Sequence, residues 1–140
     1  MIKFEIKEEK PPIWDNVCAA FKIIPHAIFT YGKTIYNPDK IQIPHDLIEH
    51  EKVHMEQQNY NDTDAALWWG RYLREESFRL DQEARAYGRQ YAVICQTVKD
   101  RNIRSRYLVA LAMSLSGPLY NKIIEHSESM KLIKHFSGVK

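Results

Sequence analysis

The chain has 140 residues, of which 44% are hydrophobic and 27% are charged, and its net charge is +2. This length predicts one domain over residues 1–140, and the composition is typical of a globular protein rather than a disordered one. No run approaches the roughly 20 apolar residues of a transmembrane helix, and the start of the chain lacks the apolar core of a signal peptide. We therefore expect no membrane partner. Two isolated cysteines without a C-x-x-C pattern are typical of a cytoplasmic protein.

The N-terminal third predicts a small β element and one helix. Alternation of charged and apolar residues predicts a short strand at residues 2–6, and prolines flank a predicted helix at residues 13–24. Runs of β-branched and aromatic residues at 27–31 and 34–36 surround a Gly-Lys pair and predict a hairpin. Residues 41–43 could add a further short strand.

The rest of the chain predicts helices. Pro44 suits the first turn of one helix, and the polar loop at residues 61–64 supplies a cap for the next. Longer helices are expected at residues 75–98 and 105–115, and a Gly-Pro pair separates the second of these from one or two C-terminal helices. The sequence therefore predicts a mostly helical α+β fold, with the hairpin or small sheet packed near the helix that Pro44 opens.

That helix carries the pattern H-E-x-x-H in His50-Glu51-Lys52-Val53-His54. Residues four apart lie one helical turn apart, so His50 and His54 can direct imidazole nitrogens at one metal ion. Glu51 reaches the same side of the helix without having to be a ligand. Two neutral nitrogen ligands with a carboxylate that can take a proton from water are typical of a catalytic Zn²⁺ site.

A third ligand has to come from elsewhere in the chain, because two histidines leave a zinc site incomplete. Residues 55–60 contain no histidine, which excludes the metzincin pattern. Glu76 and Glu83 lie at the edge of an apolar helix stripe, where a carboxylate must be paired, protonated or bound to a metal. They are roughly 10 Å apart on a helix, so only one can reach the ion. We favour Glu83, because the alanines beside it allow two helices to approach closely. The alternative for either residue is an ion pair with a nearby arginine.

Together these residues resemble a known family. The motif at His50 to His54, followed 29 residues later by Glu83-Ala84-Arg85-Ala86-Tyr87, resembles the gluzincin branch of zinc metallopeptidases. More narrowly, it is similar to the very short gluzincin-like proteins of phage and bacterial genomes. The resemblance covers roughly residues 27–90. It implies a zincin-like fold in which His50, His54 and Glu83 bind zinc and Glu51 is the catalytic base.

Two features differ from the larger gluzincins. Those proteins often have an Asp four residues after the ligand Glu, which orients the first His, whereas this chain has Tyr87. The Tyr87 phenol could orient that His or donate a hydrogen bond to the oxyanion, a role for which Tyr60, Tyr120 and His126 are further candidates. The chain is also too short for the second lobe that forms half of the cleft in larger members.

The sequence thus predicts a zinc-dependent hydrolase, a peptidase or amidase with a peptide or protein substrate, in the cytoplasm of a bacterium or of a phage-infected cell. The hairpin at residues 27–36 could bind an extended peptide by strand addition if its edge is exposed. The alternative is a non-catalytic regulatory or binding protein of a phage or bacterium with a structural or vestigial metal site. Glu51 favours the enzyme, because a structural site needs no carboxylate there.

Two other features have simpler interpretations. Trp68 and Trp69 at helical spacing predict core residues rather than an aromatic binding box. Arginines between Arg71 and Arg106 are interspersed with acidic residues. They predict a salt-paired surface, so we expect no nucleic-acid partner.

Overall fold

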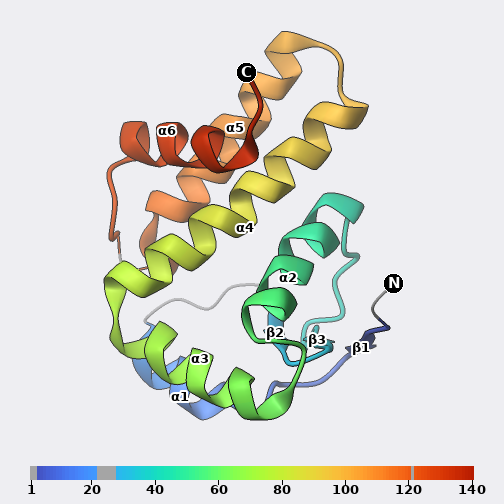
Figure 1. Ribbon diagram of the computed structural model, residues 1–140, viewed down its shortest axis with the longest axis vertical. Coiled ribbons are helices and arrows are strands. Elements are labelled where there is room, and N and C mark those ends of the chain that lie inside the picture. The colour runs from blue at the N-terminus through green and yellow to red at the C-terminus, as the bar shows by residue number, and fades with distance from the viewer. Residues whose placement is uncertain (1–2, 22–27, 121) are drawn as a thin grey trace.

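The computed structural model describes residues 3–21, 28–120 and 122–140, which fold into six α-helices, a short 3-10 helix and a three-stranded sheet (Figure 1). In chain order the elements are β1 (Glu5–Lys7), α1 (Trp14–Ala20), β2 (Phe29–Tyr31), β3 (Thr34–Tyr36), α2 (His45–Gln57), α3 (Asp62–Arg74), α4 (Glu76–Thr97), α5 (Arg101–Ser116), the 3-10 helix (Pro118–Tyr120) and α6 (His126–Ser137). The predicted mostly helical α+β class is therefore confirmed.

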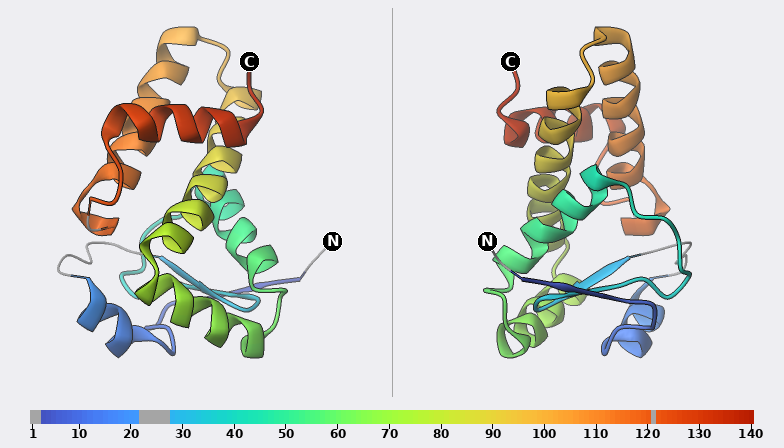
Figure 2. Two further views of the ribbon diagram at one scale, coloured as in Figure 1. Left: turned by 60° about the vertical axis from the view of Figure 1, so that its left-hand side comes forward. Right: turned by 90° about the vertical axis from the view of Figure 1, so that its right-hand side faces the viewer.

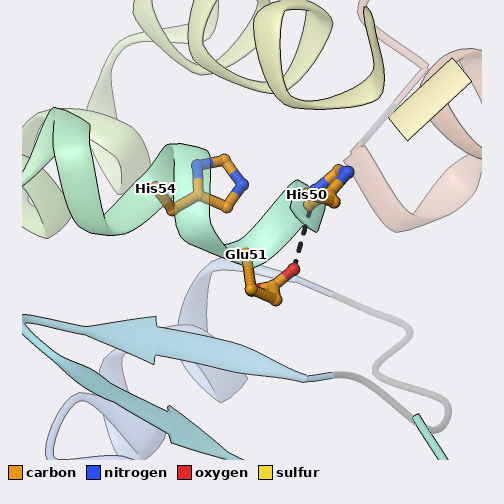
Figure 3. A group of neighbouring side chains, drawn as sticks. All are labelled: His50, Glu51 and His54. Atoms are coloured by element: carbon orange, nitrogen blue, oxygen red, sulfur yellow. Dashed lines mark ion pairs between the residues drawn. The ribbon is translucent and has the colours of Figure 1, made fainter. Parts of the chain in front are cut away.

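Helix α4 is the longest element, and most of the structure is arranged around it. It packs against α2, α3, α5 and α6, and α5 and α6 also contact each other (Figures 1 and 2). Helix α2 contacts α4 on one side and β2 on the other, so it lies between the sheet and α4 (Figure 3). In the described part of the chain, no helix is long and apolar enough to cross a membrane.

The sheet has the strand order β1-β3-β2. Strands β2 and β3 form the predicted hairpin, in which Thr30 pairs with Ile35, and β1 runs parallel to β3 with Ile6 beside Ile35. Gly32 in the turn has a φ of 65°, a left-handed conformation that favours glycine. A side chain there would also collide with Asp62, the first residue of α3.

The strand expected at residues 41–43 is absent, and this prediction was wrong. The side chain of Asn37 accepts a hydrogen bond from the backbone N–H of Ile41 at 3.1 Å and donates one to its carbonyl at 2.8 Å. Both backbone groups of Ile41 are thus used within a loop and are not available to a strand ladder. The chain stays irregular until Pro44, where α2 begins.

Several element ends differ from the predicted ones. The first strand is Glu5–Lys7, and its predicted start at residue 2 lies outside the described residues. Helix α1 ends at Ala20 because Phe21 is extended, and the predicted continuation at residues 22–24 is also outside them. Helix α5 begins four residues earlier than expected, since the Asp100 side chain accepts hydrogen bonds from the first-turn N–H groups of Asn102 and Ile103.

Helix α6 crosses α4 at Gly88, where a Cβ atom would lie 2.6 Å from Cβ of Phe136. We predict that Gly88→Ala lowers the free energy of unfolding by about 1–3 kcal/mol, because the two helices must separate to admit the methyl group. Urea denaturation measures the change.

Gly70 in α3 provides the matched control, because a Cβ atom there meets only the flexible end of Arg74, at 3.7 Å. Gly70→Ala should leave the stability unchanged or raise it by up to about 1 kcal/mol. Equal stability of Gly88→Ala and the wild type would contradict the close approach of α4 and α6.

Candidate metal centre

Three side chains of α2 form a buried cluster. The possible ligand atoms of His50, Glu51 and His54 all lie within 4.8 Å of one another, and each residue is at most 4% exposed. Figure 3 shows Glu51 on the side of α2 that faces the sheet, and the dashed line marks the 3.7 Å between its Oε2 and Nε2 of His50. The helical spacing therefore brings these three residues together as the sequence predicts.

Glu83 approaches the same cluster from α4. Its Oε1 lies 3.1 Å from Nε2 of His50 and 2.9 Å from Nε2 of His54. Glu76, the other candidate, is exposed at the start of α4. The alanines on either side of Arg85 are fully buried, as the expected close packing of the two helices requires. The structure thus brings Glu83, and not Glu76, to the two imidazoles.

The imidazole of His50 is oriented by Gln90. Nδ1 of His50 lies 3.0 Å from Oε1 of Gln90, and Nε2 of Gln90 donates to the carboxylate of Asp46 at 2.7 Å. Because a carboxylate accepts, the Gln90 amide must turn its NH₂ group to Asp46 and its oxygen to His50. Nδ1 of His50 is therefore the donor, and its Nε2 faces Glu83.

His54 is held by a similar arrangement. Its Nδ1 donates to Oε1 of Gln57 at 2.8 Å, and Nε2 of Gln57 donates to the backbone carbonyl of Gln82 at 3.1 Å. Each glutamine thus links α2 to α4 while it fixes one imidazole. Both Nε2 atoms consequently point at the same carboxylate oxygen.

Tyr87 contacts His50 with its ring rather than its hydroxyl. The two ring centroids are 4.5 Å apart in an edge-to-face arrangement, and the Tyr87 hydroxyl is 2.9 Å from that of Tyr120. The hydrogen bond that orients His50 comes instead from Gln90, which sequence reasoning missed. Gln90 is seven residues after Glu83 and hence on the same helix face, which is a signal that could have found it.

A second residue missed from the sequence is Tyr72 on α3. Its buried hydroxyl donates to Oε2 of Glu83. The two carboxylate oxygens of Glu83 therefore have separate partners, the imidazoles at Oε1 and the phenol at Oε2.

Burial and charge act in opposite directions on the cluster. Burial would lower the pKa of His54, but the neighbouring Glu83 carboxylate raises the pKa of His54 to about 9. Burial also opposes ionisation of Glu83, yet the charge of His54 and hydrogen bonds from both imidazoles hold the Glu83 pKa well below its usual value. Burial raises the pKa of Glu51. The cluster thus holds a buried carboxylate that favours a cation beside it.

The donor atoms fit a zinc ion. Around tetrahedral zinc, with bonds of about 2.0–2.1 Å, neighbouring ligand atoms are about 3.3 Å apart. The separations of 3.1 and 2.9 Å between the Glu83 oxygen and the two imidazole nitrogens are close to that value. Two imidazole nitrogens and one carboxylate oxygen are also a common set of protein ligands in catalytic zinc sites.

A cavity of about 280 Å³ adjoins the cluster, and its lining includes all four residues. Trp68 and Trp69 belong to the buried core, as predicted, and also form part of the cavity wall. Tyr120 lines the cavity as well. Among the residues that the structure describes around it, Tyr60 and His126 have no place in the lining.

Strand β2 is tied to the site through Thr30. Its hydroxyl donates to Oε1 of Glu51 at 2.9 Å, and its carbonyl accepts from Nε1 of Trp69 at 2.9 Å and Nε2 of Gln58 at 3.0 Å. The expectation of an exposed hairpin edge is therefore wrong at this residue, because that carbonyl already has two donors.

No known protein family, curated protein or solved structure matches the chain. What the site can do follows from its own residues and their geometry.

The hydrogen bond between Tyr72 and Glu83 should contribute measurably to stability. We predict that Tyr72→Phe lowers the free energy of unfolding by about 1.5–3 kcal/mol, because the variant leaves a buried carboxylate oxygen without its donor. Chemical denaturation of metal-free protein measures this. Tyr107→Phe, at a residue that is 43% exposed, is the control and should change stability by less than about 0.5 kcal/mol. An equally small effect at both positions would contradict the assigned hydrogen bond.

Proposed function

We propose that the chain is a zinc-dependent hydrolase of amide bonds, a peptidase or amidase, with His50, His54 and Glu83 as zinc ligands and Glu51 as the general base. The main support is that both imidazoles turn Nε2 to one oxygen of Glu83 while glutamines occupy their Nδ1 atoms. The resemblance to short gluzincin-like metallopeptidases rests on the same four residues.

The surroundings of Glu51 support a catalytic site over a structural one. Structural zinc sites usually have four protein ligands, whereas the proposed ligand set has three, His50, His54 and Glu83, and assigns the neighbouring carboxylate of Glu51 to the base. Thr30 donates to Oε1 of Glu51, so that oxygen already has a partner, while Oε2 is the oxygen near His50. Glu51 also lines the cavity, where a substrate and a water molecule can meet it.

When bound, zinc would supply a Lewis acid that polarises the substrate carbonyl and makes water more acidic. Glu51 takes a proton from the attacking water and passes it to the leaving amine as the C–N bond breaks. The hydroxyls of Tyr87 and Tyr120 line the same cavity and are the candidates to donate a hydrogen bond to the oxyanion. The closely packed aromatic walls limit the access of other water.

The first prediction from this function concerns metal binding. Purified protein should hold about one zinc per chain by elemental analysis, and His50→Ala or His54→Ala should lose it, because each removes one of three ligands. Glu83→Ala should weaken zinc binding strongly, while Glu76→Ala, at an exposed residue of the same helix, should not. Wild-type protein that neither contains zinc nor gains thermal stability from it would overturn the proposed function.

The second prediction concerns Glu51. Glu51→Gln keeps the size of the side chain but removes the base, so hydrolysis should fall by about 10²–10⁴-fold with zinc content and melting temperature unchanged. Glu56→Gln changes an exposed carboxylate of the same helix and should retain full activity. Equal turnover by wild type and Glu51→Gln would remove Glu51 from the mechanism. Zinc binding without hydrolysis of any peptide, peptidoglycan or small aromatic amide would favour the non-catalytic alternative.

A further inference from the structure

The cavity beside the candidate metal centre is lined mostly by buried residues. Thirteen of its sixteen described lining residues are buried. The other three are Ile28 just before β2, Leu47 in the first turn of α2, and Ser114 near the end of α5, and only Ser114 is exposed. Of the described lining, Ser114 is thus the residue most open to solvent.

The walls of the cavity are aromatic and mutually packed. Trp68 stacks on Tyr72 with ring centroids 4.8 Å apart, and Trp69 meets Trp68 edge to face at 5.1 Å. The ring centroid of Phe29 lies 6.3 Å from that of Trp69, and Phe29 continues the same wall. These rings therefore give the described lining an apolar, aromatic surface.

The described lining of the cavity carries charge only at the candidate metal centre. It contains no lysine or arginine, and its two carboxylates are those of Glu51 and Glu83. An anionic group on a substrate would lose its water without gaining a cation from the protein walls, which is costly. An uncharged group has no such cost and gains from apolar burial.

The approach along β2 is also restricted. A peptide that adds to a sheet edge needs free backbone groups on the edge strand. The carbonyl of Thr30, at the centre of β2, already accepts from Trp69 and Gln58, and Thr30 is 1% exposed. A substrate therefore does not add as a strand across Thr30.

We propose, on the basis of the zinc-dependent hydrolysis proposed above, that the cavity takes the acyl portion of the amide substrate and that this portion is a small uncharged aromatic group. The volume of about 280 Å³ is just below the roughly 300–1,000 Å³ of small-ligand pockets, which suits one ring and its carbonyl. An acyl group that bears a carboxylate, or one extended by further peptide residues, does not fit this cavity.

Hydroxamic acids test this independently of turnover, because they chelate zinc and carry a chosen acyl group. Zinc-loaded wild-type protein is titrated by calorimetry with acetohydroxamate, phenylacetohydroxamate, 4-carboxyphenylacetohydroxamate and a tripeptide hydroxamate that ends in phenylalanine. The phenyl compound should bind about 10- to 100-fold more tightly than acetohydroxamate, because it buries one ring. The carboxylate of 4-carboxyphenylacetohydroxamate and the added residues of the tripeptide hydroxamate should each remove most of that gain in affinity.

Two substitutions on α5 test whether the aromatic ring binds in the cavity. Ser114→Trp should weaken phenylacetohydroxamate binding at least about 10-fold while acetohydroxamate affinity and zinc content stay unchanged, because the indole competes with the phenyl ring for space at this exposed lining residue. Ser105→Trp changes an exposed serine of the same helix outside the cavity lining and should affect neither ligand.

The outcomes separate the two proposals. Protein that holds no zinc overturns the hydrolase function itself. Zinc-loaded protein that binds acetohydroxamate as tightly as the phenyl compound overturns only the acyl-group inference. Tighter binding of the tripeptide hydroxamate, or equal effects of the two tryptophan substitutions, would also overturn that inference and leave the zinc site standing.

Discussion

The structure depends on one buried carboxylate between two helices. Glu83 of α4 faces both imidazoles of α2, and burying such a group is costly unless charge and hydrogen bonds compensate it. The compensation comes directly from two imidazoles and the Tyr72 hydroxyl and, through the imidazoles, from the amides of Gln57 and Gln90. The polar contact between α2 and α4 is thus also what aligns the residues of the site.

This arrangement links cation binding to the association of the two helices. With both Nδ1 atoms donating to glutamines, each Nε2 can either carry a proton towards Glu83 or present a lone pair to a metal. A metal ion at this point would join α2 and α4 directly, so its binding free energy would add to their packing. The same geometry explains why Glu51 can differ in role from Glu83, since Thr30 of the sheet donates to the carboxylate of Glu51, whereas the two imidazoles and Tyr72 contact that of Glu83.

Sequence reasoning predicted the residues that follow from local periodicity. The spacing of His50 and His54 on a helix, and the position of Glu83 among small residues on a second helix, are properties of single helices and were readable. The glutamine contacts and the Tyr72 hydrogen bond depend on how three helices meet, which no local pattern specifies. The strand at residues 41–43 failed for a similar reason, because the Asn37 side chain competes for the backbone of Ile41.

The hydrogen bonds to the Thr30 carbonyl also affect how the sheet meets other molecules. Strand β2 is one edge of the sheet, and side chains of α2 and α3 already occupy its central acceptor. Among the described strands, the other edge is β1, which is three residues long and carries exposed Glu5 and Lys7. Short, charged edge strands resist pairing with strands of neighbouring molecules. The protein thereby carries a β-hairpin at its centre while offering little template for self-association through its sheet.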